Sequence, residues 1–157
     1  MIIQNNQSIY ATGKRKTAIA RLWIRERSEE ESLSQEITDE KRDFFFTLDD
    51  LKKNDCKLQV NDRDVFQYFC RPDHIMDLFR PLMLLSCKGY KIFSTVHGGG
   101  KSAQAEALRL ALSRALTNDN VRSILKREGL LTRDSRRVER KHYGHVKARK
   151  SAPYNRR

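Results

Sequence analysis

A glycine-rich turn in the second half of the chain has the residue types that best suit phosphate chemistry. Residues 95–102 read TVHGGGKS, and the last three match the end of a phosphate-binding loop. Such a loop also needs a glycine five positions before its final glycine, where this chain has Thr95. The segment therefore favours a tight strand-to-helix turn whose amides and Lys101 contact a phosphate, including one in a nucleic-acid backbone. A nucleotide-binding enzyme that uses the 98–102 turn is the less favoured alternative.

A concentration of positive charge lies at the C-terminal end of the chain. Residues 122–157 contain 13 Lys and Arg against 3 Asp and Glu, whereas residues 1–121 contain 19 against 17. From Ser135 onward, the bulky aliphatic residues are Val138 and Val146. This is too little apolar surface to offset the conformational entropy of ordering the segment. We therefore expect it to stay extended in water and to become ordered against a large polyanion.

Two further features favour RNA as that polyanion. Residues 14–16 are Lys-Arg-Lys and form a second basic cluster, which suits phosphate contact. Tyr143 and Tyr154 lie within the cationic C-terminal segment, where their rings can stack on bases. An anionic lipid surface is the alternative partner, but the segment has neither an amphipathic apolar face nor an acylation motif.

Composition excludes several other classes of protein. A chain of 157 residues with a pI near 9.9 suits one compact domain with a basic appendage. No stretch approaches the ~18–20 apolar residues that span a bilayer, so we expect no membrane partner. Cys56, Cys70 and Cys87 lack zinc-ligand spacing, so we expect no metal or cofactor and reduced, mostly buried thiols in a reducing compartment.

Hydrophobic periodicity predicts an α/β (α+β) sandwich with helices on one face of a sheet. The expected strands cover residues 8–24, 56–60 (followed by a turn at Asn61-Asp62) and 91–96. The expected helices cover residues 65–69, with Asp64 as the N-cap, residues 72–81, where Pro81 ends or kinks the helix, and residues 102–116. A last helix is expected to start at Asn118 or Asn120 and to end before Gly129. Its Ile124 and Leu125 are expected to be buried. Because the second face of the first strand mixes polar and apolar residues, we expect both of its faces to be partly covered.

An acidic segment interrupts the first half of the chain. Residues 26–43 are acidic and poor in aromatic residues, which is typical of a loop or mobile insertion. RNA would repel this segment, so we expect it to face solvent or a basic neighbouring protein. The expected organisation is a globular domain over 1–130, with this insertion at about 26–57, and an extended basic tail over 131–157.

Several motifs, in this order, resemble the small-subunit ribosomal protein nine family of the bacterial type. They are GKRKTA at 13–18, VNDR at 60–63 with Tyr68-Phe69, VHGGG at 96–100 before an Ala- and Gln-rich helix, LTRDSR at 131–136, ERKHYG at 139–144 and KARK at 147–150. The resemblance runs from about Tyr10 to Arg157, apart from the 26–57 region. It implies the fold of the second domain of ribosomal protein five, a four-stranded sheet with helices on one face and a left-handed βαβ crossover. Spacing alone favours the common right-handed crossover.

The same resemblance implies a non-enzymatic structural protein in the head of the small ribosomal subunit. Its tail is expected to thread through rRNA to the P site, where the tip meets the P-site tRNA. The expected tRNA contacts are Tyr154, Arg156 and Arg157. The expected rRNA contacts are Lys14, Arg15, Lys16, Lys101, Arg133, Arg136, Arg137, Arg140, Lys141, Lys147, Arg149 and Lys150. Neighbouring proteins of the head are the other expected partners.

Two comparisons with the family bear on the compartment and on the tip. The family commonly ends in Ser-Lys-Arg, whereas this chain ends in Asn-Arg-Arg at 155–157, which keeps the charge. The acidic insertion departs from compact bacterial members and implies an organellar, mitochondrial ribosome, with a bacterial cytoplasm or a plastid as alternatives. A free RNA-binding regulator that is not resident in a ribosome is the alternative function.

Overall fold

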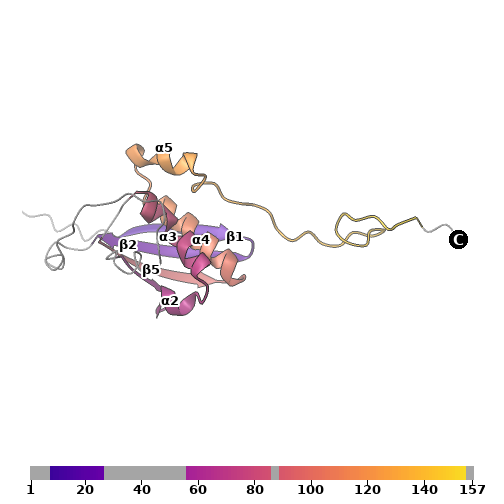
Figure 1. The fold of residues 1–157 in the computed structure, drawn as a ribbon, viewed down its shortest axis with the longest axis horizontal. Coiled ribbons are helices and arrows are strands. Elements are labelled where there is room, and N and C mark those ends of the chain that lie inside the picture. The colour runs from indigo at the N-terminus through magenta and orange to yellow at the C-terminus, as the bar shows by residue number, and fades with distance from the viewer. Residues whose placement is uncertain (1–7, 27–55, 86–88, 155–157) are drawn as a thin grey trace, which may run out of the picture.

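The computed structural model describes residues 8–26, 56–85 and 89–154, which form a mixed sheet, helices packed against it and a long C-terminal extension (Figure 1). The strands are β1 (Ile9–Arg15), β2 (Ala18–Glu26), β3 (Lys57–Val60), β4 (Arg63–Asp64) and β5 (Tyr90–His97), in the spatial order β1-β2-β5-β3-β4. The helices are α2 (Val65–Tyr68), α3 (Pro72–Leu84), α4 (Lys101–Ala115) and α5 (Asp119–Arg127). Strands β3 and β5 are parallel and every other pair is antiparallel. The α+β class is therefore confirmed, while the handedness of the β3-to-β5 crossover stays a prediction.

The opening strand expected over 8–24 is a hairpin of β1 and β2. The chain reverses at Lys16 and Thr17, and Arg15 pairs with Ala18. Lys16 adopts a φ of 50°, a left-handed conformation that two-residue hairpin turns require and that Gly or Asn usually supplies. The sequence has no such residue at the turn, which is why the expectation of a single strand was wrong.

The core lies between one face of the sheet and helices α3 and α4. Ala20, Leu22 and Ile24 of β2 are buried at every second position, as the period of a strand requires. They share a single cluster of buried side chains with Leu108 and Leu112 of α4. The opposite face of the sheet is more open than expected: Ile19 is 41% exposed and Phe93 is 43% exposed.

Gly13 lets α4 lie directly on β1. A Cβ atom at this position would stand 1.9 Å from the carbonyl oxygen of Ala107 and 2.8 Å from the amide nitrogen of Ala111. Both neighbours are helix backbone, which cannot move aside without displacing α4. The glycine of the GKRK motif is therefore a packing requirement.

Within the described residues the sheet has five strands and not the four that the resemblance implied, because the chain turns back after β3. Asn61 and Asp62 have φ values of 48° and 62°, which is the geometry of a tight hairpin turn and confirms the turn expected there. The returning strand β4 contains two residues, and it was missed because so short a strand has no detectable period. The Asn61 side chain donates to the carbonyl of Val96 (3.0 Å) and accepts from its amide (2.8 Å), so this turn also ties β3 to β5.

The helix predictions were largely correct. Asp64 caps α2, its side chain accepting from the amide of Phe66, and Pro72 is the first residue of α3. Pro81, however, does not end α3, which continues to Leu84. In α5, Leu125 is buried as expected but Ile124 is 38% exposed, so its predicted burial was wrong.

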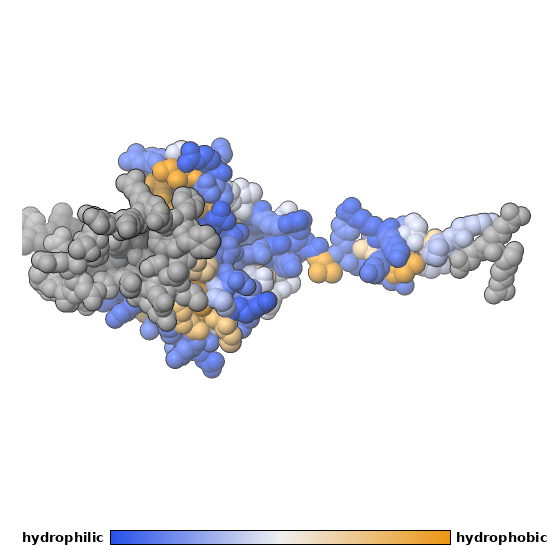
Figure 2. Space-filling model, in the orientation of Figure 1, coloured by the Kyte–Doolittle hydropathy of each residue, from blue (hydrophilic) through white to orange (hydrophobic). Residues whose placement is uncertain are grey.

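Beyond α5 the chain leaves the body of the molecule. Gly129 adopts a φ of 69° after the helix, as expected for a helix-terminating glycine. Residues 132–154 contain no helix, and their strand-like pairing is a single bridge between His145 and Ser151. Figures 1 and 2 show this tail running away from the sheet with a mostly hydrophilic surface.

The prediction that the thiols are mostly buried was wrong for the two described cysteines. Cys56 is half-buried against the core, whereas Cys70 is exposed at the end of α2, contrary to the expected burial. Cys87 lies outside the described residues.

Candidate nucleic-acid interface

Two basic turns that lie about 80 residues apart in sequence meet at one end of the sheet. Ile19, just after the β1–β2 turn, pairs with His97, just before the glycine turn. A Cβ on Gly98 would stand 2.6 Å from the carbonyl oxygen of Thr17, so the glycine turn packs directly on the hairpin turn. Gly98 and Gly99 both have positive φ values, of 72° and 66°. The two turns therefore form one continuous, polar surface.

Three exposed lysines, Lys14, Lys16 and Lys101, lie on this surface. Lys14 and Lys16 are exposed at the hairpin turn. Lys101, the first residue of α4, has its ammonium nitrogen 3.2 Å from the centroid of the Tyr68 ring, a cation–π contact. The Tyr68 hydroxyl donates to Gln104, whose amide donates in turn to the carbonyl of Gly98. The glycine turn, the aromatic ring and the lysine are thus held as one unit, with Lys101 still exposed.

The geometry does not fit a nucleotide-binding loop. Thr95, which stands where such a loop has its first glycine, lies inside β5 and pairs with Arg21. Only Gly98, Gly99 and Gly100 connect β5 to α4, and this connection is too short to wrap around the phosphates of a nucleotide. The nucleotide-binding alternative is therefore not supported.

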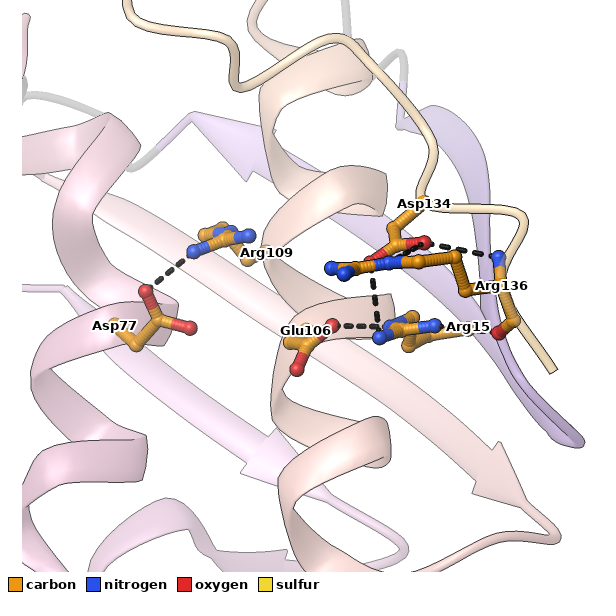
Figure 3. A network of polar contacts seen from close by, with 6 residues as sticks. All are labelled: Arg15, Asp77, Glu106, Arg109, Asp134 and Arg136. Carbon is orange, nitrogen blue, oxygen red and sulfur yellow. Dashed lines mark hydrogen bonds and ion pairs between the residues drawn. The ribbon is translucent and has the colours of Figure 1, made fainter. Parts of the chain in front are cut away.

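Arg15 occupies a different environment from the two lysines beside it (Figure 3). Its side chain is 11% exposed and points toward α4, where Nε donates to Glu106 at 2.5 Å. Nη2 pairs with Asp134 at 2.9 Å, and Nη1 donates to the carbonyl oxygen of Arg136 at 2.8 Å. These partners satisfy the guanidinium within the protein, so the geometry does not favour the expected rRNA contact by Arg15. It places Arg15 instead as the link between the sheet, α4 and the first residues of the tail.

The role of Arg15 was not predicted, although the strand pattern contains a signal for it. A strand turns alternate side chains to opposite faces, so Lys14 and Arg15 cannot both face outward from β1. Glu106 and Asp134 had no signal of their own, because their partner lies 91 and 119 positions away in the sequence.

Asp134 is the tail's half of this link. Side-chain and backbone hydrogen bonds from Arg136, together with the nearby positive charges of Arg136 and Arg15, hold the pKa of the Asp134 carboxyl well below its usual range. Asp134 therefore stays ionised and accepts from two arginines at the point where the tail leaves the body. Arg136 itself keeps an exposed guanidinium despite its contact with Asp134.

The rest of the tail presents cations to solvent. Arg149 pairs with Glu139 at 2.5 Å, and the amide of Val146 donates to the carbonyl of Lys150, so residues 142–151 form a small loop. The remaining predicted cations form no ion pair with any other described residue. They are Arg133, Arg137, Arg140, Lys141, Lys147 and Lys150, all exposed.

The tip is described in part. Tyr143 and Tyr154 are almost fully exposed. Arg156 and Arg157 lie outside the described residues.

The residues of the described ranges also bear on metal binding and on membrane insertion. These residues contain no cluster of three or more His, Cys, Asp or Glu side chains able to hold a metal ion. None of their helices is long and apolar enough to cross a membrane.

An α+β body with a basic end and an exposed cationic tail is typical of a protein that works bound to RNA. The family model described as "Ribosomal protein S9/S16" matches residues 13–157, and the chain belongs to this family. It is therefore a structural protein of the small ribosomal subunit, in a family that is in general non-enzymatic. The family expected from the motifs is confirmed.

Proposed function

We propose that this protein binds small-subunit rRNA in the subunit head through the basic end of its sheet and through its tail. The observation that best supports this is the set of exposed tail cations without an ion-pair partner in the described part of the chain. A segment so rich in positive charge gains little from folding on itself and much from releasing the counter-ions of RNA.

Each surface contributes through a defined set of residues. At the sheet end, Lys14, Lys16 and Lys101 bind phosphates, with Lys101 held in place by Tyr68. Arg15 anchors the tail so that it starts from this same end. Along the tail, the cations that bind rRNA are Arg133, Arg136, Arg137, Arg140, Lys141, Lys147, Arg149 and Lys150.

We further propose that the tail tip reaches the P-site tRNA through Tyr154, Arg156 and Arg157. The exposed ring of Tyr154 suits stacking, and the two arginines suit phosphate contact. Phosphate contacts have no sequence preference, which suits a site that must accept every tRNA.

Sedimentation tests residence in the subunit. The full chain should co-migrate with small subunits through a high-salt wash, because threading through folded RNA slows its release. A free RNA-binding regulator held by phosphate contacts would wash off, since its affinity falls steeply with salt. Loss of the chain from the washed subunits would refute the ribosomal assignment of the interface.

Truncation tests the tip. Deleting residues 155–157 should weaken P-site tRNA binding while subunits still assemble, and Asn155→Ala is the matched control that keeps both arginines. Unchanged tRNA retention and decoding in the truncated form would contradict the tRNA contact.

We infer from the acidic insertion that the ribosome is mitochondrial. The support is compositional: residues 26–43 add an acidic segment to a basic protein. Fractionation of the source cells should place the chain with mitochondrial small subunits, and recovery with cytoplasmic or plastid subunits would refute this location.

A further inference from the structure

The face of the sheet that points away from α4 presents an ordered row of aromatic side chains. In the strand register, Tyr10 lies opposite Trp23, and Trp23 lies opposite Phe93. The rings of Tyr10 and Trp23 are 5.3 Å apart and tilted by 44°. Tyr10 is 52% exposed, and Phe93 is nearly as open. These side chains, on three adjacent strands, form what we name the aromatic row.

Positive charge flanks the aromatic row on both sides. One neighbouring row consists of Arg25, Lys91 and Lys57, which lie directly opposite one another across β2, β5 and β3. On the other side of the aromatic row lie Arg21 and, one row further, Lys14. Among the described positions of β1, β2, β5 and β3 that face away from α4, there is no acidic residue.

Two of these flanking cations are open to an external anion. Arg25 and Lys57 are exposed, and neither forms an ion pair with another residue of the described ranges. A polyanion bound over this face would neutralise both charges.

We propose that the aromatic row is a stacking platform for the unpaired bases of a single-stranded RNA segment, whose phosphates the flanking cations bind. The proposal rests on the proposed rRNA binding and adds a surface separate from the tail. A single strand fits better than a duplex, because flat aromatic side chains reach only bases that are not already stacked within a helix. It fits better than a partner without a strong negative charge, because the five charged residues that flank this row are all cations, which suit phosphates.

The chain has an internal reporter for this surface. Trp23 is its one tryptophan, so its emission responds to stacking on the aromatic row and not to contacts of the tail. The full chain is titrated with a labelled, unstructured oligouridylate and, separately, with an RNA duplex of the same length. Anisotropy of the label reports binding anywhere on the protein. We expect the oligouridylate to quench Trp23 in parallel with its anisotropy change, and the duplex to bind without comparable quenching.

Substitutions identify the platform. Replacing Tyr10 and Phe93 together by Leu keeps apolar side chains but removes both rings, and should weaken oligouridylate binding roughly tenfold at a salt concentration that suppresses phosphate contacts. The comparison variant replaces Tyr143 and Tyr154 of the tail together by Leu: it can weaken overall binding, but at saturating oligouridylate the extent of Trp23 quenching should equal that of the unaltered chain. Phe93→Tyr keeps a ring and should retain binding. Circular dichroism checks that each variant is folded, as is expected for substitutions at exposed positions.

The outcomes separate the two proposals. Equal quenching by duplex and single strand would overturn the platform, as would an unchanged oligouridylate affinity in the Tyr10/Phe93 variant. So would the finding, in cross-linked small subunits, that this face contacts only a neighbouring protein. If neither RNA changes the anisotropy at all, the proposed rRNA binding itself is refuted and the platform with it.

Discussion

Substituting Arg15 by Met should test whether the body and the tail are joined by one side chain. The substitution keeps an unbranched stem of similar apolar bulk and removes the guanidinium. Glu106 then loses its counter-ion, and the carbonyl oxygen of Arg136 loses its donor. Breaking a fully buried pair by removing one partner costs about 3–5 kcal/mol, but the Glu106 side chain is 30% exposed and water can partly replace the arginine. We therefore expect a loss of about 2 kcal/mol in the free energy of unfolding.

Two measurements check this expectation. Thermal unfolding should show a Tm lower by about 4–8 °C, and urea unfolding should show a lower midpoint with the same slope. Hydrogen exchange should be faster in residues 130–137 of the variant, because the root of the tail is released from the body. Arg80→Met is the matched control: Arg80 also pairs with a glutamate, Glu128, but it is largely exposed, so its loss should change stability by no more than about 0.5 kcal/mol.

If Arg15→Met behaved like Arg80→Met in both assays, Arg15 would not join the body to the tail. A stability loss without faster exchange at 130–137 would show that Arg15 stabilises the sheet–helix packing but does not anchor the tail.

Three further predictions concern packing, pH and salt. Gly13→Ala should prevent normal folding, because the added Cβ would overlap the backbone of α4. In the control Gly100→Ala, the added Cβ has no neighbour within 4 Å, so the free energy of unfolding should change by about 1 kcal/mol or less. Far-UV circular dichroism with urea unfolding compares the two variants. Hydrogen bonds from Arg136 are the main cause of the depressed folded-state pKa of Asp134, so the stabilising contact between these two side chains should be complete above the unfolded pKa of about 3.9 and be lost as the pH falls toward the lower folded value. The carboxyl ¹³C shift of Asp134 should titrate at a higher pH in Arg136→Met than in the unaltered chain, and equal titration would refute this contact. Removing residues 137–157, which hold eight Lys and Arg, should reduce the salt slope of rRNA affinity by roughly 5 in filter-binding assays, and an unchanged slope would show that the tail does not bind phosphates.

Local patterns in the sequence were enough to predict most of the body. The helix caps at Asp64 and Gly129, the helix α4 and the turn at Asn61-Asp62 all depend on residues close together in the chain, and all were predicted correctly. The β1–β2 hairpin was not, because Lys16 adopts a left-handed conformation without the residue type that usually indicates one. The two-residue β4 was too short to show a period.

The parts of the interface that could not be predicted depend on long-range contacts. Composition identified the cationic tail, but not that Asp134 would hold its root against Arg15. It also did not separate Arg15 from the lysines on either side, although strand alternation does so once the strand is known. The aromatic row required the register of three strands, which brings Tyr10, Trp23 and Phe93 side by side from positions up to 83 residues apart.

The most direct test of the account is photo-cross-linking from the tail within intact small subunits. A photoactivatable amino acid replaces Tyr143, whose side chain is fully exposed in the isolated protein, and the cross-linked products are mapped after irradiation. We expect cross-links to small-subunit rRNA. Cross-links to proteins alone, or back to the body of this chain, would contradict the role of the tail as an RNA-binding segment.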